Sequence, residues 1–171
     1  MSIIVVGKTN MTMKGHHHYT LTVEWTGNNG TGTSHAAAYE RSHTVKAEGK
    51  ADLMCSSDPA FRGDNTKHNP EEFLLSAVSS CHMLWYLHLC ADAGIIVHEY
   101  IDYPEGEMVE ATATERGRFT EITLHPLVTI TDGTRVQDAE QLHGKAREKC
   151  FISNSCNFPI YHQPTIIVKE P

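Results

Sequence analysis

The chain has 171 residues, which fits a single domain able to bury about 70 % of its unfolded surface. Its formal net charge is −7 with histidine neutral, and this disfavours a nucleic-acid partner. The five cysteines are odd in number and form no CxxC pair, which argues against a secreted disulfide framework and a zinc ribbon. Near the start only Ile3–Val6 is apolar, with no basic region before it, so no signal peptide is expected. We therefore expect a cytoplasmic protein.

The N-terminal part is expected to be an extension, residues 1–18, in front of one domain, residues 19–171. Ile3–Val6 is a possible short strand. The run His16–His18, whether native or added, has no partner cluster and fits a solvated stretch better than a metal site. Strict alternation over Tyr19–Trp25 predicts a half-buried strand, which ends in a turn rich in Asn and Gly at residues 26–30.

A second strand is predicted over Ala37–Glu48. Its inward face would carry Tyr39, Arg41, His43, Val45 and Ala47, and the opposite face is fully polar. A guanidinium on an apolar face needs a negative partner, because burying it unpaired is costly. Alternatively, Arg41 lies near a strand end and its side chain reaches water. Residues 51–68 are expected to form a loop, in which Cys55 has no evident role.

The middle of the chain predicts one long helix, from Pro70 to Ala93. Pro70 suits the first helical position, two glutamates follow it in the first turn, and Gly94 fits the left-handed residue that ends a helix. The run is apolar on nearly all sides, so we expect a helix buried in the core or in a dimer interface. A membrane span is disfavoured because serines and histidines interrupt the run and the flanks lack basic and aromatic residues.

The C-terminal part alternates again. Three strands are predicted, over residues 97–103, 109–113 and 122–130, as an antiparallel meander with a turn at residues 104–106. A second helix follows over Val136–Cys150, then a loop over residues 151–156 and a closing strand over residues 165–169. This order predicts an α+β fold, with both helices on one side of a mainly antiparallel sheet.

Two cysteines stand on these helices. Cys81 lies in the middle of the first helix, and Cys150 lies on the apolar stripe of the second. A packed core cysteine is the simpler interpretation of Cys81 alone, since free cysteine is among the most buried residue types. Together with Arg41, however, the two thiols suggest a redox site. A cation favours the thiolate that attacks a peroxide, and the sulfenic acid so formed condenses with a second thiol.

The chain resembles the OsmC/Ohr family of thiol peroxidases. The resemblance covers roughly residues 19–169 and is carried by Asn69-Pro70-Glu71-Glu72-Phe73-Leu74-Leu75, Ser79-Ser80-Cys81-His82 and Lys149-Cys150-Phe151-Ile152-Ser153-Asn154. Two further segments, residues 23–28 and 56–63, are similar to its OsmC-like branch. The resemblance implies reduction of organic hydroperoxides by an intertwined homodimer, with an external dithiol as reductant and without a metal or organic cofactor.

The resemblance also implies roles for individual residues. Cys81 would be the peroxidatic thiol, Cys150 the resolving thiol and Glu71 the active-site glutamate. Arg41 matches the family's arginine, with Arg62 as the alternative. Phe151 departs from the proline that many members of the Ohr branch carry after the second cysteine. Cys156 is additional to the family pattern and could compete as a resolving thiol.

Helix geometry adds two expectations. Glu71 and Cys81 lie about 15 Å apart along one helix. If both belong to one site, we therefore expect the Glu71 of one subunit to meet the Cys81 of the other. Cys90 lies roughly on the opposite side of the helix from Cys81 and should not be its partner. Two other functions remain open. One is an apolar-ligand binding protein in which Cys81 is only packed. The other is a Cys–His hydrolase, although His82 points away from Cys81 and would be a poor base for it.

Overall fold

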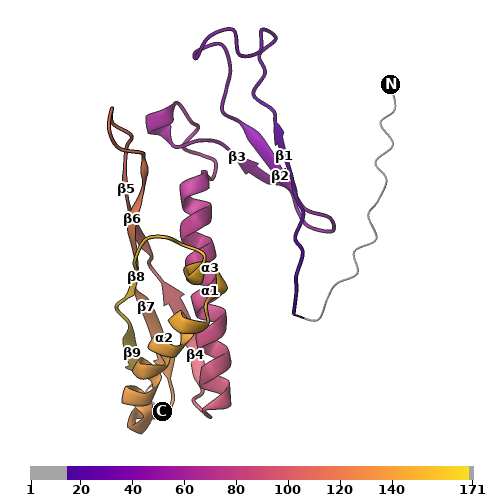
Figure 1. The fold of residues 1–171 in the computed structure, drawn as a ribbon. Coiled ribbons are helices and arrows are strands. Elements are labelled where there is room, and N and C mark those ends of the chain that lie inside the picture. The colour runs from indigo at the N-terminus through magenta and orange to yellow at the C-terminus, as the bar shows by residue number, and fades with distance from the viewer. Residues whose placement is uncertain (1–14, 170–171) are drawn as a thin grey trace. The chain divides into compact units, whose positions relative to one another are not determined.

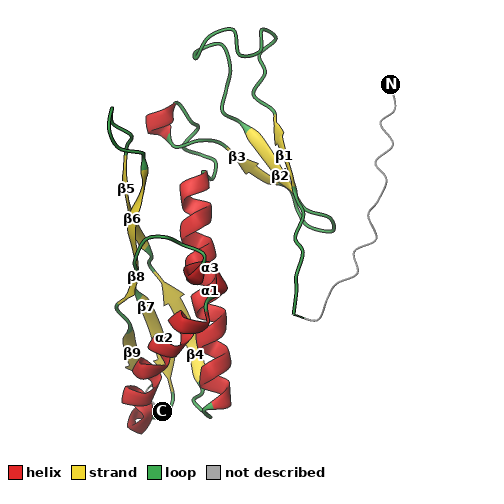
Figure 2. Cartoon of the chain, viewed as in Figure 1, coloured by secondary structure: helices red, strands yellow, loops and turns green. Residues whose placement is uncertain are grey.

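The structure, a computed structural model, describes residues 15–169, which form two compact units divided between Asn69 and Pro70. The possible strand at Ile3–Val6 and most of the expected extension lie outside the described residues. The first unit contains β1 (Thr22–Trp25), β2 (His43–Lys46), β3 (Leu53–Cys55) and the 3-10 helix η1 (Pro59–Phe61). The second unit contains α1 (Pro70–Asp92), β4 (Val97–Asp102), β5 (Glu105–Val109), β6 (Arg118–Leu124), β7 (Pro126–Ile130), η2 (Gly133–Arg135), α2 (Val136–Lys149), α3 (Phe151–Asn154), β8 (Ile160–His162) and β9 (Thr165–Val168), as Figures 1 and 2 show.

The first unit is a small antiparallel sheet in the order β1-β2-β3. Its first strand exists but begins only at Thr22 and is exposed, so the predicted half-burial is wrong. Strand β2 is also shorter than predicted, and the expected loop contains both β3 and η1. The predicted inward face of the second strand is wrong, because the structure buries Ser42 and Thr44 from the polar face instead. Hydrogen bonds make this burial possible, since the Ser42 hydroxyl accepts one from Lys67 Nζ at 2.9 Å and Thr44 Oγ1 lies 3.7 Å from Met54 Sδ.

The second unit is organised by α1, which begins and ends close to the predicted residues. Gly94 has φ +69°, the left-handed conformation expected after the helix, and Ile95 N–H donates to the Cys90 carbonyl at 2.8 Å. The fully buried side chains of α1 recur every fourth residue and form one stripe: Val78, His82, Tyr86 and Cys90. By length and hydropathy α1 could cross a membrane, but core helices of soluble proteins share these properties, and this stripe packs into the unit's own core.

Two three-stranded sheets complete this unit, in the orders β4-β7-β9 and β5-β6-β8. The antiparallel pairs are β4–β7 and β5–β6, whereas β8 and β9 add parallel to β6 and β7. The predicted meander is therefore wrong. The stretch predicted as one strand over residues 122–130 is in fact two strands, which separate at His125 and belong to different sheets. The predicted turn at residues 104–106 overlaps β5. Strand β8 was not predicted. The mainly antiparallel α+β class is confirmed, since four of the six strand pairs within residues 15–169 are antiparallel.

The apolar positions of β6 and β7 point inward as predicted. Ile122, Leu124, Val128 and Ile130 are fully buried, and they divide between two core clusters. The larger cluster joins Tyr86 and Cys90 of α1, Val128 and Ile130 of β7, and Ala139, Leu142 and Ala146 of α2. Because both helices pack on the same alternate residues of β7, they lie on one side of the β4-β7-β9 sheet, as expected (Figure 2).

Candidate functional site

Cys81 lies in the middle of α1, beside the buried stripe and not within it. It follows Val78 by three residues and precedes His82 by one, so its side chain borders the covered face of the helix and is half-buried. Val78 packs in the smaller core cluster, together with Ile152 and Cys156 from the segment that follows α2. The helix thereby presents the Cys81 thiol to that segment.

Cys150 ends α2 and begins α3. Its backbone is extended, with φ −69° and ψ 108°, and this break separates the two helices. The side chain is completely buried, and its sulfur accepts a hydrogen bond from the Ser153 backbone N–H at 3.4 Å. The helix end was predicted correctly, whereas the following residues form α3 in place of the expected loop. The turn of the chain at Cys150 directs the thiol inward.

The structure brings Cys81 and Cys150 together. The pKa of the Cys81 thiol is raised, first by burial and second by the neighbouring Cys150 thiol. The nearby backbone N–H groups of Ile152 and Phe151 act on this pKa in the opposite direction, because a donor favours the thiolate. All five cysteines are free thiols. Two neighbouring cysteines can form a disulfide when their Cα atoms lie within about 7 Å of each other.

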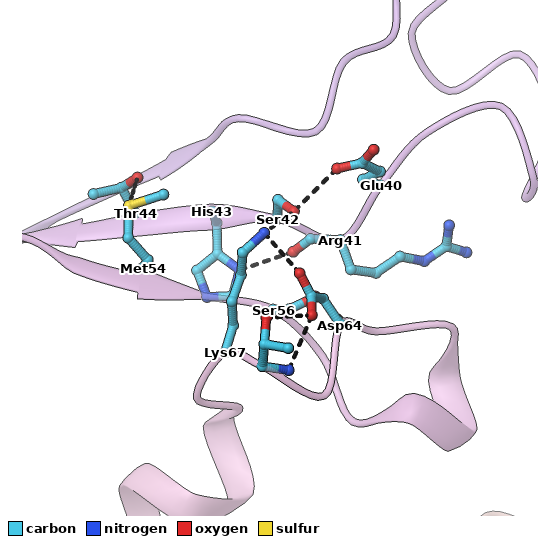
Figure 3. Close-up of polar contacts among 10 residues, drawn as sticks. Glu40, Arg41, Ser42, His43, Thr44, Met54, Ser56, Asp64 and Lys67 are labelled. Atoms are coloured by element: carbon cyan, nitrogen blue, oxygen red, sulfur yellow. Dashed lines mark hydrogen bonds and ion pairs between the residues drawn. The ribbon is translucent and has the colours of Figure 1, made fainter.

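Arg41 and Arg62 belong to the first unit, so their pairing with Cys81 stays a prediction. Arg41 lies just before β2, near the strand end that was one of the two alternatives. Its Nη1 donates to the carbonyls of Ala36 at 2.8 Å and Tyr39 at 2.7 Å, and its guanidinium lies 4.3 Å from the centre of the Tyr39 ring. Figure 3 shows this side chain pointing away from the cluster of Ser42, Asp64 and Lys67. Arg62 is exposed, with φ 67° at the end of η1.

Glu71 lies in the first turn of α1, and the continuous helix to Cys81 separates the two residues along its axis as expected. One of its carboxylate oxygens, Oε2, is enclosed and has no hydrogen-bond partner among the described residues. An enclosed carboxylate oxygen is costly unless a donor reaches it. Its place in the site stays a prediction, and a donor from a second chain would satisfy it.

Sequence reasoning missed a stack of three histidines beside the site. His82 Nε2 lies 3.0 Å from His143 Nδ1, and the His162 ring stacks on His143 and is tilted against His82. Burial lowers the pKa of His82 to about 4 and that of His143 to about 3, so both are neutral. Helical spacing could have found them, because His82 follows Val78 by four residues and His143 follows Ala139 by four. The ring of His82 is committed to this stack and not to Cys81, which agrees with its expected direction.

Neither the stack nor any other group of His, Cys, Asp or Glu side chains among residues 15–169 has an arrangement that could hold a metal ion. Cys90 is also accounted for, since it lies in the larger core cluster beside the Tyr86 side chain and away from the Cys81–Cys150 pair. Cys55 is fully buried in the first unit, where its thiol donates to the Leu53 carbonyl at 3.3 Å.

The chain is an α+β protein with a long central helix, and comparison with known proteins identifies its family. The family model for OsmC-like protein matches residues 63–163. The chain therefore belongs to the OsmC-like family, as its motifs predicted. No curated protein matches the chain.

Solved structures agree with this assignment. An OsmC-like protein of unknown function from Vibrio cholerae is 25% identical with a TM-score of 0.79, over 88% of this chain and 100% of that chain. An organic hydroperoxide resistance protein OsmC from Legionella pneumophila is 19% identical with a TM-score of 0.63, over 90% and 100%. An organic hydroperoxide resistance protein from Elizabethkingia anophelis is 21% identical with a TM-score of 0.61, over 92% and 100%. The last two show the fold alone.

Proposed function

We propose that the protein is a cysteine-based peroxidase that reduces organic hydroperoxides to alcohols. The observation that carries the proposal is the adjacency of the Cys81 and Cys150 thiols at the junction of α1, α2 and α3. The family includes proteins named for organic hydroperoxide resistance, which supports the substrate class. The redox-active residues would be Cys81 and Cys150, with no metal or organic cofactor.

The reaction divides into three steps. The Cys81 thiolate attacks the outer peroxide oxygen, the O–O bond breaks, and the alkoxide takes a proton and leaves as the alcohol. The Cys150 sulfur then attacks the Cys81 sulfenic acid, which forms the disulfide and releases water. An external dithiol finally reduces this disulfide by two exchanges and becomes a disulfide itself. A cytoplasmic location is proposed because the cycle begins with both cysteines as free thiols.

Arg41 and Glu71 are proposed to complete the site. A guanidinium beside Cys81 would favour the thiolate and offset the effect of burial, which raises the pKa of that thiol. The carboxylate of Glu71 would hold that guanidinium. Because the helix separates Glu71 from Cys81 along its length, the glutamate would come from the partner of an intertwined homodimer. Arg62 is the alternative cation.

One observation favours a second candidate, an apolar-ligand binding protein in which Cys81 is only packed. Within one chain burial raises the pKa of Cys81, and a thiol that stays protonated at neutral pH is a poor nucleophile. The two candidates differ in the reactivity of Cys81. Slow alkylation of Cys81 by iodoacetamide at pH 7, together with no consumption of hydroperoxide, would favour the binding protein.

The proposal is tested by thiol titration before and after one equivalent of cumene hydroperoxide, with hydrogen peroxide in a parallel sample. We expect the wild-type chain to lose two thiols, and to lose them faster with cumene hydroperoxide. Cys81→Ser should abolish consumption, whereas Cys150→Ser should allow a single turnover and then stop. Cys90→Ser, at a buried thiol outside the pair, is the matched control and should behave as wild type. Rapid turnover by the Cys81→Ser protein would refute the assignment.

A further inference from the structure

A third thiol, Cys156, lies at the other end of α3 from Cys150. Cys150 precedes the first residue of this short helix, and Cys156 follows its last residue by two positions. The Cys156 N–H donates to the Ser153 carbonyl at 3.2 Å, and its thiol donates to the Ile152 carbonyl at 3.3 Å. These two bonds fold the segment after α3 back onto the helix, so that both ends of α3 carry a cysteine held by the backbone of the same turn.

This turn lies beside all three sulfurs. The Ile152 carbonyl accepts the Cys156 thiol, the Ser153 N–H donates to the Cys150 sulfur, and the Ile152 N–H lies near Cys81 and lowers the pKa of its thiol. Cys156 also packs against the smaller core cluster, where Val78 of α1 lies one helical turn from Cys81. The pKa of the Cys156 thiol is raised by burial and by the proximity of Cys150. The sulfurs of Cys81, Cys150 and Cys156 therefore gather around one turn of backbone, and we call them the three-thiol cluster.

The members of the three-thiol cluster differ in access. Cys150 is 0% exposed, so an external dithiol cannot reach its sulfur. Cys156 is half-buried and lines a pocket of about 380 Å³, whose other walls are Arg147, Glu148, Ser153, Asn154, Phe158 and Ile160. A small dithiol fits such a pocket, and its thiolate could approach the Cys156 sulfur from outside. An oxidised Cys150 can therefore be reduced only through the sulfur bonded to it, and Cys156 is a neighbour that faces this pocket.

We propose that Cys156 is a second resolving thiol, which takes over the disulfide from Cys81 and presents it to the external reductant in this pocket. The proposal rests on the peroxidase function proposed above and deepens it. The Cys156 thiolate, having lost its proton to water, attacks the Cys150 sulfur of the Cys81–Cys150 disulfide. The Cys150–Cys156 bond forms, the Cys81–Cys150 bond breaks, and the electron pair leaves on the Cys81 sulfur. No net oxidation occurs in this exchange, and the dithiol later reduces the Cys150–Cys156 bond.

A stoichiometric consequence follows. Because the exchange releases Cys81 as a thiolate, it can reduce a second hydroperoxide before any reductant arrives. The second reaction leaves Cys81 as a sulfenic acid, with its former partner already bonded to Cys156. A chain with all three thiols should therefore consume about two equivalents of hydroperoxide without reductant, and a chain that lacks Cys156 about one.

The test supplies two equivalents of cumene hydroperoxide, without reductant, to the wild-type chain and to Cys156→Ser, and measures the hydroperoxide that remains. We expect the wild type to consume about twice as much as the variant. Cys55→Ser is the matched control, because the Cys55 thiol donates to the Leu53 carbonyl at 3.3 Å just as Cys156 donates to Ile152. A serine keeps either hydrogen bond, and Cys55→Ser should consume as much as the wild type.

Peptide mapping identifies the bond directly. Trypsin places Cys150 and Cys156 in one peptide, residues 150–169, and Cys81 in another, residues 68–116. A Cys150–Cys156 bond leaves the first peptide alone and lighter by two hydrogens, whereas a Cys81–Cys150 bond joins the two peptides. Equal consumption by wild type and Cys156→Ser, with only joined peptides, would overturn the role of Cys156 and leave the peroxidase standing. No consumption by any of the proteins would instead refute the peroxidase itself. Mapping of the wild type alone decides the role if the variant does not fold.

Discussion

The two compact units differ in what stabilises them. The second unit contains two clusters of fully buried apolar side chains, drawn from α1, α2 and the strands β6 and β7. The first unit buries mainly polar side chains, namely Ser42, Thr44, Ser56 and Asn69, with Cys55 as its buried apolar residue. Meanwhile Leu21 and Val23 are 62% and 61% exposed, although their alternation with polar residues predicts a half-buried strand. A sheet with an apolar face and no core of its own is expected to gain stability from a covering partner.

Polar contacts organise the first unit instead. Lys67 Nζ bonds to Ser42 Oγ at 2.9 Å and Asp64 Oδ2 at 3.0 Å, and the Asp64 N–H donates to Ser56 Oγ at 3.0 Å (Figure 3). Such bonds add little where water competes for the same groups. The comparison therefore assigns most of the unfolding free energy to the second unit, where Cys81, Cys150 and Cys156 lie, and leads us to expect that the first unit gains stability from a covering partner.

The largest expected effect tests the core of the second unit. Leu124→Ala removes a fully buried side chain from the smaller cluster and should lower the free energy of unfolding by about 2–5 kcal/mol, because it leaves a cavity. The measurement is urea unfolding followed by circular dichroism. Leu53→Ala is the control in the first unit, since Leu53 is 45% exposed and should change the same quantity far less. Equal losses from the two variants would contradict the comparison.

Acid should weaken the second unit through its histidine stack. The pKa of His82 in the folded chain is about 4 and that of His143 about 3, both below the ordinary value of 6.5, because burial disfavours the charged form. The unfolded chain therefore takes up protons first as the pH falls. Their contribution is fully present above about pH 6.5 and is lost progressively toward pH 4 and then pH 3.

The measurement is the free energy of unfolding at pH 7.5 and at pH 5.0. Each titrating histidine contributes a slope of at most about 1.4 kcal/mol per pH unit. The neighbouring His162 also lowers the pKa of both histidines, and burial and Arg147 lower the pKa of His162 itself. His143→Gln should flatten the slope, and His98→Gln, at an exposed histidine of β4, should leave it unchanged. A wild-type stability that does not change over this range would exclude the role of the stack.

The open face of the first unit gives the next prediction. If a second copy of the chain covers β1, Val23→Ser should weaken dimerisation roughly tenfold, because burying a valine side chain is worth about 1.5–3 kcal/mol. Sedimentation equilibrium measures the dissociation constant. Thr22→Ser changes the neighbouring residue of the same strand, which points to the other face of the sheet, and should leave it unaltered. A wild-type chain that is monomeric at all concentrations would remove the expected homodimer.

The same comparison shows what could be predicted from sequence. Local sequence signals predict three features of the fold: the limits of α1, the inward positions of β6 and β7, and the end of α2 at Cys150. A cap, a hydrophobic period or a turn residue marks each of them. The division at His125 and the strand β8 escaped prediction, because parallel pairing with distant strands decides them and leaves no local mark. Arg41 was placed on an inward face by alternation, but β2 begins only at His43.

For the site, the sequence could supply two cysteines on helices but not their surroundings. The contacts of the Ile152 and Ser153 backbone with the three-thiol cluster exist only because α3 replaces the expected loop. A helix of this length carries no periodic pattern of its own. The histidine stack was within reach, since His143 falls on the buried stripe of α2 together with Ala139 and Ala146.

The smallest expected effect comes from the Asp58 cap of η1, one of the polar contacts that organise the first unit. Asp58 caps η1, where its Oδ1 accepts the Ala60 N–H at 2.7 Å. Asp58→Ala should reduce local stability by about 1 kcal/mol, and Asp58→Asn, which keeps an acceptor, should lose much less. Hydrogen exchange of the Ala60 and Phe61 amides measures this opening. Faster exchange at these amides with unchanged exchange along α1 would mean that the first unit opens without the core of the second. Equal acceleration in both units would mean that the two unfold as one, and that the missing apolar core of the first is supplied from within the same chain.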